Sequence, residues 1–129
     1  MRTYLKLFTL LLISSSANAA EFKPYQEAKI SIEEFEKYKA IIVEKFGDSV
    51  VKVPDQNLVV YLDNSKGNYA FTTQGHPAHP AWIARRVVES NGSIDIEQIG
   101  YFAGKEKPFA VLFKQYLELN EKVKKGIPN

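Results

Sequence analysis

Residues 82–102 read WIARRVVESNGSIDIEQIGYF, and this stretch decides the fold. Two runs rich in β-branched and aromatic residues, 82–89 and 93–102, flank Asn91-Gly92, the dipeptide that most strongly favours a two-residue hairpin turn. If Asn91 and Gly92 form the turn, Val87 faces Ile96 and Arg86 faces Glu97. This register places an apolar pair on one face of the hairpin and an ion pair on the other.

A second hairpin is predicted upstream. The β pattern starts at residues 50–53, which lead to Pro54, and continues in the β-branched run 58–62. Residues 63–68 form a turn-favouring cluster, and residues 69–73 are the return strand. In the later hairpin, Gly100 predicts a bulge. Ile94 and Ile96 lie in one phase of the strand alternation, whereas Ile99 and Tyr101 lie in the opposite phase.

Two amphipathic helices enclose the strands. Ser31 and Glu34 form a capping box that starts the first helix at Ile32, and Gly47 is the expected left-handed stop. Pro108 suits the first turn of the second helix, which Gly126 and Pro128 end. The apolar positions of both follow helical spacing: Phe35, Tyr38, Ile41, Ile42 and Phe46 in the first, and Phe109, Leu112, Phe113, Tyr116, Leu117 and Val123 in the second.

These elements predict a single α+β domain over residues 31–126, in the order α-β-β-β-β-α, after an extended lead-in at 20–30 and before a tail at 127–129. Short connections between strands favour a four-stranded antiparallel sheet of two hairpins, with both helices packed on one face. The element order resembles a cystatin-like variant, in which a helix packs on an antiparallel sheet. That resemblance is the alternative fold, and it carries no functional residue.

The N-terminus has the pattern of a secretory signal peptide. Arg2 and Lys6 precede the apolar run at 7–13, and residues 14–19 end in an A-x-A site, which predicts cleavage between Ala19 and Ala20. The apolar run is too short for a stable membrane anchor. An exported chain with no Cys fits a bacterial route better than a cross-linked animal module. The expected location is the periplasm or the medium.

Charge and motifs exclude several functions. The chain has 17 Lys and Arg and 15 Asp and Glu, and cleavage would remove Arg2 and Lys6 and no acid, leaving 15 of each sign. A neutral mature protein does not suggest binding to nucleic acid. The glycines are dispersed, so no phosphate-binding loop is present and no cofactor is expected.

The uncovered face of the predicted sheet is the first candidate site. If both helices cover the other face, this face is left to solvent or to a partner protein. It would carry two aromatic and four other side chains, namely Trp82, Arg86, Val88, Asp95, Glu97 and Tyr101.

The connector QGHPAHPA at residues 74–81 is the second candidate. Both histidines of the chain lie here, each before a proline, which favours extended backbone. His76 and His79 would then point the same way, although zinc needs at least one more ligand, and no spacing selects one. Acid–base chemistry at the histidines lacks a recognisable nucleophile, so no catalytic residue is assigned. A rigid structural connector accounts for the same residues.

The leading hypothesis is an exported, non-catalytic binding protein that engages another envelope or secreted protein as an inhibitor, an adaptor or an immunity-type factor. The alternative is a small His-dependent enzyme or metal-binding protein that uses His76 and His79.

Overall fold

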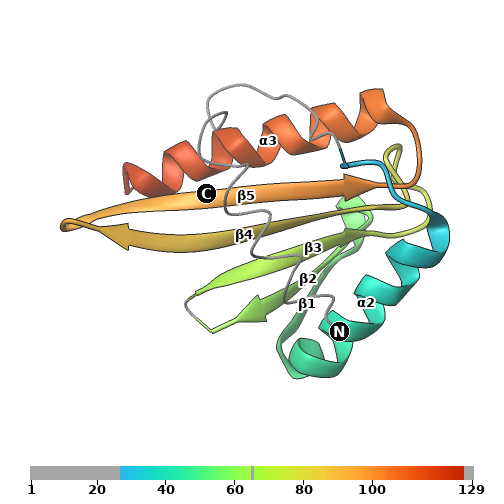
Figure 1. Cartoon of the computed structure of the whole chain (residues 1–129), viewed down its shortest axis with the longest axis horizontal. Coiled ribbons are helices and arrows are strands. Elements are labelled where there is room, and N and C mark those ends of the chain that lie inside the picture. The colour runs from blue at the N-terminus through green and yellow to red at the C-terminus, as the bar shows by residue number, and fades with distance from the viewer. Residues whose placement is uncertain (1–26, 65, 127–129) are drawn as a thin grey trace.

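The computed structural model describes residues 27–64 and 66–126, which form one five-stranded antiparallel sheet and two α-helices (Figure 1). The strand order follows the chain, so every strand pairs with its sequence neighbours. The elements are α2 (Ile32–Phe46), the 3-10 turn η2 (Gly47–Ser49), β1 (Val50–Val53), the 3-10 turn η3 (Pro54–Gln56), β2 (Leu58–Asp63), β3 (Gly67–Thr72), β4 (Ala81–Ser90), β5 (Ser93–Phe102) and α3 (Glu106–Lys124).

Both predicted hairpins are confirmed. In the β4–β5 hairpin, Val87 pairs with Ile96 and Arg86 with Glu97, as the Asn91-Gly92 turn requires. Asn91 and Gly92 both have positive φ, 53° and 81°, the backbone conformation of a type I′ turn. The β2–β3 hairpin closes around the predicted turn cluster.

The sheet has five strands where the sequence predicted four. The additional strand is β1, which pairs with β2 at the edge of the sheet. The chain reverses between them through η3 and Asn57, whose φ is 55°. Asn tolerates this left-handed conformation better than most residues. The four residues of β1 are too few for a clear alternation, which explains why they read as an approach to β2.

The expectation that both helices cover one face is wrong. Successive residues of a strand point to opposite faces, and along β4 they contact different helices. Trp82 and Ala84 belong to the core cluster with Phe35 of α2, whereas Ala81 and Ile83 belong to the cluster with α3. The first four residues of β4 are all apolar and buried, so both faces need a cover. We call the two sides of the sheet the α2 face and the α3 face.

The predicted bulge at Gly100 is also wrong, because β4 and β5 pair without interruption from Ala81↔Phe102 to Ser90↔Ser93. Gly100 serves the packing of α3 instead. A Cβ built on it would lie 2.8 Å from Cζ of Phe109 and 3.1 Å from Cδ2 of Phe113. The absence of a side chain therefore allows α3 to approach β5 closely.

The helix boundaries agree with their sequence signals except at one end. Ser31 and Glu34 form the capping box, and α2 begins at Ile32. Gly47 is not left-handed (φ −59°), and the chain continues into η2. In α3, Val123 is 42% exposed, so the apolar stripe ends before it.

The lead-in is described only from Glu27 onward, and there Ala28 and Ile30 exchange backbone hydrogen bonds with Phe102 of β5. The predicted signal peptide and the tail at 127–129 lie outside the described residues. No helix within residues 27–64 and 66–126 is long and apolar enough to cross a membrane.

Candidate functional site

The six residues predicted for an open sheet face do not form one exposed surface. Trp82 and Tyr101 are 1% and 7% exposed and lie beneath α2. The Trp82 ring stacks on Phe71 at a centroid distance of 5.0 Å, and Tyr38 of α2 lies 5.5 Å away. These two predicted binding residues are therefore part of the core, and their placement on an open face is wrong.

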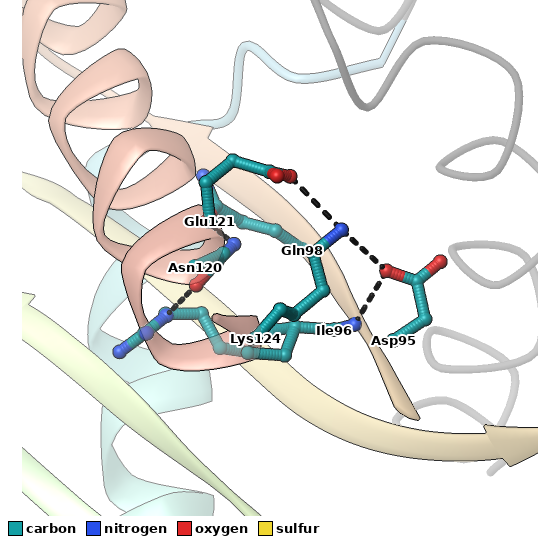
Figure 2. A network of polar contacts seen from close by, with 7 residues as sticks. Asp95, Ile96, Gln98, Asn120, Glu121 and Lys124 are labelled. Carbon is teal, nitrogen blue, oxygen red and sulfur yellow. Dashed lines mark hydrogen bonds and ion pairs between the residues drawn. The ribbon is translucent and has the colours of Figure 1, made fainter. Parts of the chain in front are cut away.

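The other four residues lie together on the part of the β4–β5 hairpin near its turn. Arg86 forms an ion pair with Glu97 at 3.6 Å, and Val88 pairs with Asp95 in the register. Asp95 accepts a hydrogen bond from the backbone N–H of Ile96 and another from Lys124, which lies between Asp95 and Glu121 in Figure 2. The charges of Asp95 and Glu97 thus have cationic partners within the protein, and Lys124 attaches the end of α3 to β5.

The histidine connector is held by hydrogen bonds of its own. His76 Nδ1 accepts a hydrogen bond from the backbone N–H of Ala78 at 2.9 Å. His79 Nδ1 lies 2.7 Å from Thr72 Oγ1, and its ring packs edge-on against Phe35. The two rings are thereby fixed by different neighbours. Within the described residues, no group of three or more His, Asp or Glu side chains could hold a metal ion.

Burial lowers the pKa of both histidines below the ordinary value of 6.5, and a lesser contribution comes from the His79 charge at His76 and the Lys39 charge at His79. A His with a lowered pKa in the folded state favours the unfolded state when it takes up a proton. We expect full stability above pH 6.5 and a loss as the pH falls from 6.5 through the folded-state pKa values.

Urea midpoints of the native chain and of the double variant His76→Gln/His79→Gln, compared from pH 8 to pH 5, test this expectation. As the pH falls, the urea midpoint of the native chain should decrease relative to that of the double variant, which lacks both histidines. A difference between the two midpoints that stays constant over this range would show that neither histidine is destabilised by protonation.

A polar network crosses the α3 face, where the sequence predicted only apolar contacts. The backbone carbonyl of Phe113 accepts a hydrogen bond from Gln98 Nε2, Gln98 Oε1 accepts one from Asn120 Nδ2, and Asn120 Oδ1 accepts one from Arg85 Nε. Figure 2 shows Asn120 and Gln98 within this network. Because a carbonyl can only accept, it fixes the orientation of both amides. Gln98 and Asn120 are each 4% exposed, so the network is buried at its centre.

Arg85 ends this network as a half-buried cation. Its guanidinium carbon lies 5.0 Å from the centre of the Tyr116 ring, a cation–π contact. Burial lowers the pKa of Arg85 and raises the pKa of Tyr116, yet an arginine stays charged at any physiological pH. Asn68 of β3 lies directly opposite Arg85, and its buried Oδ1 has no hydrogen-bond partner among the described residues.

A groove of about 540 Å³ lies beside this network, between α3 and the start of β2. Three segments line it: α3, the η3–β2 region and the histidine connector. Its volume falls within the range of about 300–1,000 Å³ that is usual for ligand sites. The lining combines three leucines with amide, aromatic and charged side chains, namely Gln56, Leu58, His76, Leu112, Gln115, Tyr116, Glu118, Leu119 and Lys122.

Of the residues proposed from the sequence, the groove contains only His76. Arg85, Gln98 and Asn120 were missed, although two of them carry a signal. Asn120 falls four residues after Tyr116 in the apolar stripe of α3, and Gln98 is in phase with Ile96. A polar residue at an inward position predicts a buried hydrogen-bonded group.

Comparison with known proteins gives no assignment, since no protein-family model, no curated protein and no solved structure matches the chain.

Proposed function

We propose that the protein is an exported, non-catalytic binding protein that holds an extended segment of another envelope or secreted protein in the groove between α3 and β2. The observation that carries the proposal is the groove itself, a concave surface of about 540 Å³ built from three separate segments. Export rests on the signal-peptide pattern of residues 1–19.

The lining chemistry favours a peptide. Leu58, Leu112 and Leu119 supply apolar contacts for side chains, while the amides of Gln56 and Gln115 offer both donors and acceptors. An extended peptide presents backbone N–H and C=O groups that need such partners, together with alternating side chains that fill apolar depressions.

His76 supports binding more than catalysis. In the neutral ring, Nδ1 accepts the Ala78 N–H bond, so the proton resides on Nε2. Nε2 can then donate to a carbonyl of a ligand in the groove. Action as a general base would need a second proton on the ring, which would break the bond to Ala78. The enzymatic alternative therefore requires the connector to rearrange.

Selection of short random peptides displayed on phage against the full chain tests the proposal. Selected peptides should bind Gln115→Trp at least about tenfold more weakly than the native protein, a loss of about 1.4 kcal/mol, because an indole would occupy the groove. Lys114→Trp is the matched control, since Lys114 is the exposed neighbour on α3 and does not line the groove.

The control should bind the peptides as the native chain does, with both affinities measured by calorimetry. Equal losses in the two variants, or no peptide that depends on the groove, would contradict the proposal.

A further inference from the structure

Arg85 is a half-buried charge without an anionic partner. The described residues place no carboxylate in an ion pair with it, and its one hydrogen bond runs from Nε to Asn120. A guanidinium carries five N–H donors, so the four on its terminal nitrogens have no acceptor within the described part of the chain. These terminal nitrogens are not among the buried atoms that lack a partner, so they are accessible to solvent and to a ligand.

Its neighbour Arg86 provides the contrast within the same strand. Arg86 points to the α2 face, is exposed and pairs with Glu97 at 3.6 Å. The two arginines are adjacent in sequence and identical in chemistry, but only Arg86 has an acid to neutralise it. The difference makes Arg86 an internal reference for any measurement on Arg85.

The surroundings of Arg85 hold the guanidinium in a fixed orientation. The relay from the Phe113 carbonyl through Gln98 and Asn120 positions Nε, and the Tyr116 ring covers the guanidinium at 5.0 Å. A fixed guanidinium with free terminal nitrogens presents two parallel N–H groups, the geometry that matches the two oxygens of a carboxylate. Binding then costs little side-chain entropy.

Arg85 is connected to the groove through Tyr116, which both covers the guanidinium and lines the groove. Arg85 itself does not line the groove, so a ligand carboxylate would reach the guanidinium past the Tyr116 side chain.

We propose that Arg85 binds a carboxylate of the ligand in a bidentate manner, so that the groove selects peptides that place an acid at the Tyr116 wall. This inference rests on the proposed function for the identity of the ligand as a peptide. The carboxylate site itself does not depend on the proposed function, because a small acid can occupy that site alone.

The test uses acetate as the probe and the arginine Nε–H signals of the full chain, followed by NMR. The chain has three arginines, Arg2, Arg85 and Arg86, and Arg→Lys substitution assigns each signal. Sodium acetate is titrated against sodium chloride at constant ionic strength. The Arg85 signal should move and saturate, with half of its change at about 10 mM acetate, as expected for one bidentate contact, while the Arg86 signal should not follow it.

An Arg85 signal that does not saturate, or that moves in parallel with the Arg86 signal, would overturn the inference, because general screening would then explain the change. Substitution of Arg2 and Arg86 alone assigns the remaining signal to Arg85, so the titration remains decisive even if substitution of Arg85 impairs folding. Where the variant folds, Arg85→Lys should bind acetate at least about tenfold more weakly, because Lys keeps the charge but lacks the two parallel N–H groups of a guanidinium. Arg86→Lys should bind it as the native chain does.

Peptides that bind in the groove distinguish the groove function from the carboxylate site at Arg85. Acid and amide forms of the same peptide show whether the bound group is the C-terminal carboxylate or an acidic side chain. If Arg85→Lys binds both as tightly as the native chain does, the carboxylate site is wrong and the groove function stands. If acetate binds at Arg85 but no peptide depends on Gln115, the carboxylate site stands and the groove function is wrong.

Discussion

Trp82→Ala should lower the free energy of unfolding by about 3–5 kcal/mol, the usual range for loss of a large buried aromatic side chain. Trp82 is 1% exposed and contacts Phe71, Tyr38 and Tyr101 on the α2 face. Urea unfolding followed by circular dichroism measures the loss.

Val88→Ala is the control for Trp82→Ala. Val88 lies on the same strand and the same face but is half-buried near the hairpin turn, so its truncation should cost about 1 kcal/mol or less. Similar small losses of unfolding free energy in both variants would mean that α2 does not cover Trp82. The open face expected from the sequence would then be supported.

Asn120→Leu should destabilise the protein by about 2–4 kcal/mol, although Leu is apolar and close in size. The change removes the acceptor of Arg85 Nε and the Asn120 donor to Gln98 Oε1 in a buried region. Each unsatisfied group costs about 1–3 kcal/mol, and more if charged. Thermal and urea unfolding of the variant measure the combined effect.

The double variant Asn120→Leu/Arg85→Met separates the charge from the packing. Removal of the guanidinium eliminates the unpaired cation, so the double variant should be more stable than Asn120→Leu alone. If the second substitution adds a further loss, the network does not hold Arg85, and the argument for a fixed guanidinium fails.

Local signals determine how much of this fold can be predicted from the sequence. Asn91-Gly92 sets the register of the β4–β5 hairpin, because its two positive φ values form a turn whose twist matches that of the strands. Ser31 and Glu34 set the start of α2 by satisfying free backbone N–H groups. Both effects act within a few residues, so no tertiary information is needed.

The side of the sheet that each helix covers depends on contacts distant in sequence. The continuous apolar run at Ala81 to Ala84 was the available sign that both faces are buried. Strand alternation alone places Trp82 and Tyr101 on an open face. Gly100 was likewise assigned to the strand backbone, whereas its role is set by Phe109 and Phe113 of α3.

The candidate site could be predicted only in part for the same reason. The local pattern of the connector indicates His76, but Gln56 and Gln115 join it in the groove only after α3 packs on the sheet. The polar residues Gln98 and Asn120 stand at inward positions of a strand and a helix. Their mutual hydrogen bond cannot be deduced until the α3 face is known.

The most direct test of the account is a map of backbone amide shifts on the full chain when a selected peptide binds. We predict that the largest shifts fall on groove residues from two separate segments, such as Leu58 and Leu119, and on Arg85. Shifts confined to Arg86, Val88, Asp95 and Glu97, with the groove unchanged, would place binding on the α2 face of the hairpin and contradict the account.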